Sequence, residues 1–211
     1  MRIITAAATV AIVVSAQDVF LDDALTSPTT GWTKVSYTSD DYHIQTPCGD
    51  AKSEHYSYSG GVHHFKIHKG DGPWDCSNPP KTNPRSEMSL IPLAYNSGQH
   101  QLQAWITVPK GTHNACLQQI FGAQESASAY MMRVFDENGG TLKHYRTEVL
   151  ASGIYDTEFK YNIIHNTNTH RIKVYINDNL KLDTEDGGFP SIGHWYFKTG
   201  VYMQGDGTDN S

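Results

Sequence analysis

Beyond its N-terminal segment, the chain repeats one pattern that favours β-structure. Short stretches with β-branched and aromatic residues alternate with turn clusters such as Gly70-Asp71-Gly72, Asn138-Gly139-Gly140 and Asp186-Gly187-Gly188. Helical periodicity is hard to find in this part. Many short strands in one domain predict an all-β fold with two packed antiparallel sheets, a jelly-roll β-sandwich. The expected strands cover residues 33–38, 55–58, 62–68, 87–91, 101–108, 117–123, 130–136, 141–148, 159–165, 171–176 and 195–204.

The clearest local prediction is a β-hairpin over residues 171–183. Polar and apolar residues alternate through 171–176, and Asn177-Asp178-Asn179 supplies the turn. Leu180 and Leu182 then continue the alternation on the returning strand. We interpret this hairpin as scaffold and assign it no chemistry.

The N-terminus has the pattern of a secretory signal peptide. Arg2 precedes an apolar run over residues 3–14, and Val14-Ser15-Ala16 offers small residues for a signal peptidase. The run is short for a membrane anchor, which is the alternative. We therefore expect a signal peptide over residues 1–16, a single domain over residues 17–211, and an extracellular protein.

The charge balance argues against binding to polyanions by bulk attraction. Lys and Arg total 16 against 22 Asp and Glu, which gives a formal net charge of −6. Nucleic acids and anionic membranes are therefore unexpected partners. An acidic substrate would need a local positive field inside a cleft.

The three cysteines fit a secreted chain with one disulfide. Cys48 and Cys76 lie in the loop-rich N-terminal half and are the preferred pair. Cys116 lies beside an expected core strand and is expected to be a buried free thiol. No C-x-x-C spacing occurs, so the cysteines predict no metal site.

Two segments carry polar residues on one strand face. In extended conformation Arg85, Glu87 and Ser89 point one way, while their neighbours point the other way. Over residues 195–204 the polar face holds Tyr196, Lys198, Tyr202 and Gln204. The alternative is a solvated outer face. In a third segment, Gln119 and Phe121 share one face of an otherwise apolar strand.

These three segments resemble signatures of the alginate lyases of polysaccharide lyase family 7. Arg85-Ser86-Glu87-Met88 resembles R-[ST]-E-[LV], and Gln119-Ile120-Phe121 resembles Q-[IV]-H. Residues 196–204 resemble Y-F-K-A-G-x-Y-x-Q, and the three segments follow the family's order. The resemblance implies a concanavalin A-like jelly roll with an active cleft on its concave sheet. Glucuronan lyases are similar in fold and chemistry.

The resemblance also implies roles in a β-elimination. Such a lyase must neutralise a uronate carboxylate, remove the C5 proton and protonate the departing O4. Arg85 and Gln119 suit the carboxylate, and Tyr202 suits the acid at O4 and, with cations nearby, also the base. Lys198 suits a neighbouring uronate, and Glu87 suits holding Arg85 in place. The remaining substrate-binding candidates on the resembling strand are Tyr196 and Gln204.

The chain departs from the family pattern at three places. Phe121 stands where the family has its catalytic histidine, and a phenyl ring cannot take a proton. Ser89 stands where a second arginine is frequent. The sequence ends at Ser211, where the family continues into a further strand.

Two histidines are candidates to replace the missing imidazole. His64 and His68 share a strand face, and His64 lies nearer the middle of the expected strand. If that strand lay beside the Arg85 strand, His64 would suit a general base and His68 a substrate contact. Exposed surface histidines are the plain alternative. A zinc site formed by the two lacks a third ligand at suitable spacing.

The sequence therefore predicts a monomeric, cofactor-free lyase that cuts a polyuronate, with alginate as the first choice. One alternative is a glucuronan lyase of the same fold. Another is a non-catalytic carbohydrate-binding sandwich, which Phe121 favours. A glycoside hydrolase would need two carboxylates beside the scissile bond, and Glu87 has no evident partner.

Overall fold

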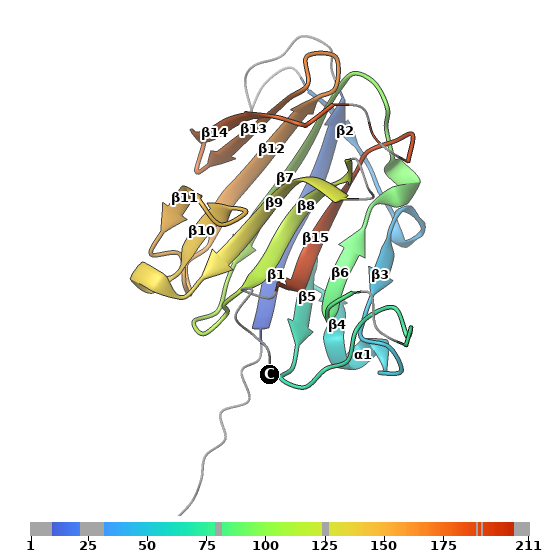
Figure 1. Ribbon diagram of the computed structural model, residues 1–211, viewed down its shortest axis with the longest axis vertical. Coiled ribbons are helices and arrows are strands. Elements are labelled where there is room, and N and C mark those ends of the chain that lie inside the picture. Colours follow the sequence, from blue (N-terminus) through green and yellow to red (C-terminus); the bar gives the residue numbers. More distant parts are fainter. Residues whose placement is uncertain are drawn as a thin grey trace, which may run out of the picture.

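The computed structural model describes residues 10–21, 32–78, 82–123, 127–188, 190 and 192–204, with side chains described from Trp32 onward. Two antiparallel sheets pack face to face in a jelly-roll β-sandwich (Figure 1), as expected. Within the described ranges, no helix has both the length and the apolar character needed to cross a membrane.

One sheet has eight strands and the other seven. The order in the eight-stranded sheet is β14 (Asn179–Glu185), β13 (Arg171–Ile176), β12 (Phe159–Asn166), β7 (Gln99–Thr107), β1 (Val10–Leu21), β5 (Val62–Ile67) and β4 (Tyr56–Ser59), with β2 (Thr33–Val35) also on β1. The order in the seven-stranded sheet is β11 (Glu148–Ser152), β10 (Thr141–His144), β9 (Ala127–Phe135), β8 (Ala115–Ala123), β15 (Tyr196–Met203), β6 (Arg85–Ser89) and β3 (His43–Gln45).

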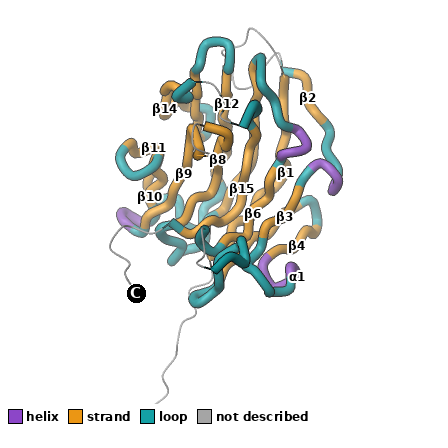
Figure 2. Tube along the Cα trace, turned by 45° about the vertical axis from the view of Figure 1, so that its right-hand side comes forward, coloured by secondary structure: helices purple, strands orange, loops and turns teal. Residues whose placement is uncertain are grey.

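Among the described residues, helical structure is limited to single turns between strands (Figure 2). They are the α-helix α1 (Lys52–His55) and the 3-10 turns η1 (Ser39–Asp41), η2 (Ile91–Leu93) and η4 (Glu137–Gly139). This content agrees with the absence of helical periodicity in the sequence.

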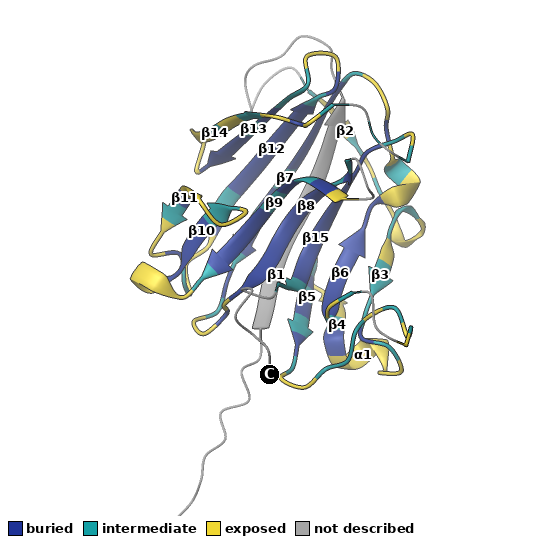
Figure 3. Ribbon diagram, in the orientation of Figure 1, coloured by how far each residue is buried: buried dark blue, intermediate teal, exposed yellow. Residues whose placement is uncertain are grey.

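The hydrophobic core lies between the two sheets, where the strands are darkest in Figure 3. Leu102 and Ile106 of β7 and Ile120 of β8 are almost completely buried. Each such side chain stabilises the fold by about 1.5–3 kcal/mol relative to exposure. A buried hydrogen bond also joins the two sheets through the core. The Tyr161 hydroxyl of β12 donates to the side-chain oxygen of Gln118 of β8 at 2.7 Å.

The predicted hairpin is confirmed as β13 and β14. Asn177 and Asp178 have φ values of 49° and 62°, the left-handed conformation that a tight hairpin turn requires. The expected strand over 141–148 is wrong, because the chain turns at Tyr145, where φ is 49°, and forms β10 and β11 instead. The first expected strand is also shorter than predicted and ends at Val35.

The expected signal peptide lies partly outside the described residues, at 1–9. Residues 10–16 belong to β1, which pairs with β5 on one side and β7 on the other. Removal of a signal peptide after Ala16 would shorten β1 to residues 17–21. Cleavage itself stays a prediction.

The cysteine assignments are confirmed. Cys48 and Cys76 form a disulfide, and Cys116 is a buried free thiol. Burial in apolar surroundings raises the pKa of the Cys116 thiol, so it remains protonated and packs as a small core side chain.

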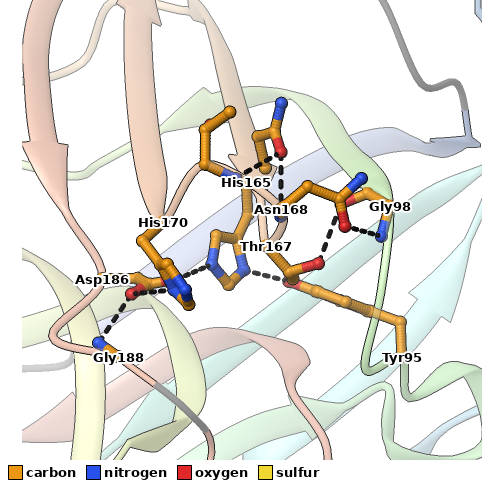
Figure 4. A network of polar contacts seen from close by, with 10 residues as sticks. Tyr95, Gly98, His165, Thr167, Asn168, His170, Asp186 and Gly188 are labelled. Carbon is orange, nitrogen blue, oxygen red and sulfur yellow. Dashed lines mark hydrogen bonds and ion pairs between the residues drawn. The ribbon is translucent and has the colours of Figure 1, made fainter.

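A buried polar network joins β12 to the segment that follows β14 (Figure 4). His165 Nε2 lies 2.9 Å from Asp186 Oδ2, and its Nδ1 lies 3.0 Å from the Tyr95 hydroxyl. Because a carboxylate only accepts, Nε2 carries the proton and Nδ1 accepts the Tyr95 O–H. His170 Nδ1 approaches the same carboxylate at 3.2 Å, and the Gly188 amide donates to it at 2.7 Å.

Candidate functional site

A cleft lies over the middle of the seven-stranded sheet, where β8, β15 and β6 are neighbours. Its volume is about 550 Å³, within the range typical of small-molecule sites. The lining side chains belong to Gln45, Trp74, Thr82, Arg85, Gln119, Phe121, Ala127, Ser128, Met131, Tyr145, Tyr196, Lys198 and Tyr202.

Strand β15 supplies the central row of the cleft. Its pairing sets Tyr202 opposite Arg85 of β6, and Lys198 opposite Gln119 of β8. One step further along, Tyr196 lies opposite Phe121. The cleft therefore has a Tyr202 end, a Lys198–Gln119 middle and a Phe121 end.

Gly200 makes this arrangement possible. The register of β15 against β8 shifts between Thr199 and Tyr202, which is a β-bulge, and Gly200 has a φ of 143°. A Cβ atom at this position would lie 2.4 Å from the backbone oxygen of Ser86 and 2.7 Å from the Cα of Glu87. Only glycine lets β15 and β6 approach this closely beneath the cleft.

Glu87 organises the donors of the site from below. Its Oε2 lies 2.5 Å from Lys198 Nζ and 3.3 Å from Arg85 NH1, and its Oε1 accepts a hydrogen bond from the Gln119 amide. The Gln119 carbonyl in turn accepts from Ser128 at 2.6 Å. One carboxylate against two cations leaves a formal charge of +1 at the base of the cleft.

Burial shapes the ionisation of the lining groups. It lowers the pKa of Lys198, and the charge of Arg85 lowers it further, while Glu87 opposes both effects. Burial and the charge of Glu87 raise the pKa of Tyr196. Burial also raises the pKa of Tyr145 to about 12, and its hydroxyl donates to the backbone oxygen of Ser128. Tyr196 and Tyr145 are therefore protonated near neutral pH.

The cleft holds buried polar atoms that have no hydrogen-bond partner in the part of the chain that the structure describes. They are Arg85 Nε, Gln45 Oε1 and Thr82 Oγ1. The guanidinium carbon of Arg85 lies 3.8 Å from the Tyr202 ring centroid and 5.6 Å from the Trp74 ring centroid. An unpaired buried group is costly unless a ligand or water satisfies it: Arg85 Nε needs an acceptor, Gln45 Oε1 needs a donor, and the Thr82 hydroxyl can take either.

Most of the residues selected from the sequence come together here. Arg85, Gln119, Tyr202, Lys198 and Tyr196 line the cleft. Glu87, also a substrate-binding candidate, contacts three of the cleft's donors from below and does not itself line the cleft.

Gln204 lies apart from the lining residues. Its amide donates to the backbone oxygen of Met203, and its backbone N–H donates to Asn114. The strand alternation placed Gln204 on the same face as Tyr202, but β15 ends at Met203, so the alternation does not extend to it.

The expectation that His64 or His68 supplies an imidazole is wrong. Strand β5 belongs to the eight-stranded sheet, and its inward positions are His63, Phe65 and Ile67. His64 therefore points to the outer side of that sheet, and His68 follows the strand near His55. Neither lines the cleft, so neither can act there as base or substrate contact.

Phe121 occupies the histidine position of the resembling motif, and no imidazole lines the cleft among the described residues. Its ring lies 5.4 Å from the Tyr196 ring and 5.5 Å from Lys198 Nζ. That end of the cleft is lined by aromatic rings, and the imidazole of His194, whose buried Nε2 has no hydrogen-bond partner among the described residues, lies outside the lining with its ring 5.9 Å from that of Tyr196.

Sequence reasoning missed several lining residues. Ser128 comes from β9, whose neighbours could not be known, Tyr145 comes from the turn between β10 and β11, and Gln45 comes from the short edge strand β3. Trp74 gave a usable signal, since a tryptophan in a proline-rich loop near Cys76 is an unusual surface residue.

The potential metal ligands that gather in the described ranges are Asp50, His55 and Asp71. They lie beside α1 rather than in the cleft, and include neither His64 nor His68. Both ring nitrogens of His55 already face acceptors, at 3.2 Å from Asp50 and 3.2 Å from the Lys66 carbonyl. The zinc alternative therefore gains no support.

The fold and the site together define a jelly-roll sandwich with a cleft on one sheet that is lined by cationic, amide and aromatic side chains. The sequence model of the alginate lyase 2 family, described as alginate lyase, matches residues 25–211, and the chain belongs to this family. This agrees with the resemblance drawn from the three motifs.

Individual relatives carry two kinds of description. A protein of Hevea brasiliensis named citrate-binding protein is 36% identical over 183 residues, which cover 87% of this chain and 74% of the relative. Among solved structures, alginate lyase AlgAT5 of polysaccharide lyase family 7 is 24% identical, with a TM-score of 0.57 over 80% of this chain and 85% of its own. The alginate lyase from Corynebacterium sp. is 17% identical, with a TM-score of 0.54 over 93% and 86%. The two structures show the shared fold.

Proposed function

We propose that the protein is a polysaccharide lyase that cleaves a polyuronate, alginate or glucuronan, by β-elimination. The observation that carries the proposal is the convergence of Arg85, Gln119 and Tyr202, three residues far apart in sequence, around one cleft. Membership of the alginate lyase family supports the same reaction class.

The base of the cleft suits a uronate carboxylate. Arg85 offers an unpaired buried Nε, and the Gln119 amide group has a second hydrogen beyond the one donated to Glu87. Together with the net positive charge of the Arg85–Lys198–Glu87 cluster, these donors stabilise the charge that develops on the carboxylate as C5 loses its proton.

Tyr202 is the group that moves the proton. It lines the cleft in contact with Arg85, whereas Tyr145 and Tyr196 are held protonated and Lys198 is ion-paired with Glu87. Acting as the base, Tyr202 takes the C5 proton on its phenolic oxygen, the electron pair of the C5–H bond forms the C4–C5 double bond, and the C4–O4 bond breaks. The phenol then returns the proton to O4, so neither water nor a cofactor is consumed.

The test follows the ultraviolet absorbance of the unsaturated uronate during incubation with alginate and with glucuronan. The native chain should produce a steady rise, and Tyr202→Phe should reduce it at least about 100-fold, the contribution of a positioned acid–base group. Tyr58→Phe is the matched control, because Tyr58 is 57% exposed on β4 of the other sheet. An unaltered rate in Tyr202→Phe would contradict the mechanism.

A second candidate function is binding of a carboxylate ligand without cleavage. Phe121 favours it, since the cleft keeps its anion-binding donors but lacks an imidazole. The relative named citrate-binding protein favours it as well.

Calorimetric titration with citrate and with uronate oligosaccharides separates the two candidates. Binding that Arg85→Gln weakens about tenfold or more, together with no absorbance rise on any polymer, would establish a binding protein instead of a lyase. Turnover of polymer by the native chain would establish the lyase.

We also propose that the protein is secreted. The N-terminal pattern of residues 1–16 and the Cys48–Cys76 disulfide, a bond that persists in oxidising compartments, support this. Sequencing the N-terminus of protein recovered from culture medium should give Gln17. An intact Met1 in secreted material would contradict cleavage.

A further inference from the structure

One wall of the cleft is formed by a loop. Trp74 belongs to the segment after β5, which runs from His68 to Cys76 without a strand. Trp74 lines the cleft, is 39% exposed, and its ring centroid lies 5.6 Å from the guanidinium carbon of Arg85. Because a loop lacks the backbone pairing of a strand, contacts outside the cleft must hold this side chain in place.

A buried histidine outside the cleft contacts this loop. His55 of α1 is 1% exposed. Its Nε2 lies 3.2 Å from Asp50 Oδ2, and its Nδ1 lies 3.2 Å from the Lys66 carbonyl oxygen and 3.5 Å from Asp71 Oδ2. Asp71 precedes Trp74 by three residues. The imidazole therefore joins the segment before β4 to the loop that carries the tryptophan.

Asp71 also closes the turn at the start of the loop. Its Oδ2 accepts a hydrogen bond of 2.5 Å from the backbone N–H of His68, and its own N–H donates to the His68 carbonyl at 3.2 Å. An aspartate that bonds its local backbone in this way stabilises a turn. The carboxylate that faces His55 thus sets the direction in which the chain approaches Trp74.

The main chain of His55 is bonded to the strand that carries Arg85. Ser86 Oγ donates a hydrogen bond of 2.7 Å to the His55 carbonyl oxygen, and Ser86 is completely buried. Strand β6 begins close to α1 (Figure 1). Because the loop leads back to Arg85 through Trp74, the contacts form a closed ring. Its members, in order, are Arg85, Ser86, His55, Asp71 and Trp74.

We infer that His55 is a positioning residue for ligand binding, which fixes the distance between Trp74 and Arg85 and with it the width of this part of the cleft. His55 itself does not line the cleft. The ligand is a uronate whose carboxylate binds Arg85 and whose ring lies on the Trp74 indole. The inference rests on the proposed function in this choice of ligand.

A double-variant cycle tests whether His55 acts through Trp74. Calorimetric titration with a uronate oligosaccharide compares His55→Leu, Trp74→Ala and the double variant. His55→Leu alone should weaken binding about fivefold, because leucine offers Asp50 and Asp71 no N–H. In the Trp74→Ala background it should weaken binding by less than about twofold, since residues that act through one another are not additive. Equal losses in the two backgrounds would overturn the inference.

Two further variants separate positioning from a general loss of stability. His55→Gln should recover part of the affinity, because an amide still donates a hydrogen bond. His165→Leu is the matched control, because His165 is also completely buried beside a carboxylate, Asp186, but lies in the other sheet. It should lower the urea midpoint and change binding by less than about twofold. Equal weakening by His165→Leu and His55→Leu would overturn the positioning role.

The loop can also be followed without a ligand. The difference in fluorescence between the native chain and Trp74→Phe isolates the emission of Trp74. His55→Leu should increase quenching of this emission by acrylamide, because a released loop exposes the indole. Unchanged quenching would overturn the inference. A native chain that binds no uronate would overturn the proposed ligand instead, and the quenching would then decide the role of His55 alone.

Discussion

Lys198 and Glu87 form an ion pair of 2.5 Å with only 3% and 1% of their side-chain surfaces exposed. Breaking a buried pair by removing one partner leaves an uncompensated charge, which costs about 3–5 kcal/mol. This pair links the stability of the sandwich to the order of its cleft, because the same carboxylate also holds Arg85 and Gln119.

Glu87→Gln should therefore lower both stability and ligand binding. We expect a loss of about 3 kcal/mol in the free energy of unfolding, measured by urea denaturation, because Lys198 and Arg85 would face each other without an anion. The double variant Glu87→Gln/Lys198→Met should recover part of that loss. If the single variant unfolds at the native midpoint, the carboxylate does not organise the site.

Gly200→Ala should disrupt the cleft by pushing apart two strands. The added Cβ would meet the Ser86 carbonyl at 2.4 Å, so we expect a loss of several kcal/mol, above the 1–3 kcal/mol typical of a strained backbone alone. Gly187→Ala separates the two effects, because Gly187 has a φ of 80° and no heavy atom within 4 Å of the added Cβ. Equal thermal shifts in the two variants would rule out the steric explanation.

Trp74→Ala should weaken substrate binding more than turnover. Trp74 lines the cleft, is 39% exposed and approaches Arg85 at 5.6 Å, which gives a sugar ring an aromatic surface. We expect KM to rise about tenfold, equivalent to about 1.4 kcal/mol, with kcat changed less. Trp74→Phe should restore part of the affinity. A fall in kcat at constant KM would instead indicate a role in the chemical step.

The Cys48–Cys76 disulfide should also contribute to substrate binding, because it holds the loop that carries Trp74. The Cys48 amide donates to the Pro73 carbonyl at 2.9 Å, so the bridge fixes the segment that carries Trp74. The double variant Cys48→Ser/Cys76→Ser should raise KM in the direction of Trp74→Ala. An unchanged KM in this variant would show that the loop is held without the bridge.

Stability should fall as the pH drops from about 6.5 towards 4. Burial, with a smaller effect of the His64 charge, lowers the pKa of His63 to about 4, and burial also lowers the pKa of His165. Both imidazoles are thus neutral in the fold but protonate near 6.5 when unfolded, so the unfolded state binds more protons in this window. Each group should contribute a slope on the order of 1 kcal/mol per pH unit.

Urea midpoints measured between pH 4 and pH 8 would check this slope. His63→Phe should flatten part of it, and His113→Ala should leave it unchanged, because His113 is 52% exposed. A midpoint that stays constant from pH 8 to pH 4 would contradict the assignment of buried neutral histidines.

Sequence patterns predicted the scaffold well because they report local constraints. Turn residues at Asn177 and Asp178 fixed one hairpin, and the alternation of Arg85 with Ser86 correctly separated cleft side from core side. The same alternation failed for His64. It indicates which residues share a face, but not which sheet a strand joins, and β5 joins the sheet that lies behind the cleft.

The sequence by itself determined an all-β chain and a set of polar strand faces, because strand period and turn chemistry act over a few residues. Only the tertiary structure decided which faces meet. The partnership of Glu87 with Lys198, the strand contact at Gly200 and the separation of the β5 histidines from the cleft depend on pairings between segments that are far apart in sequence, such as β6 and β15. Such pairings arise from the packing of the whole core, which no short stretch of sequence encodes.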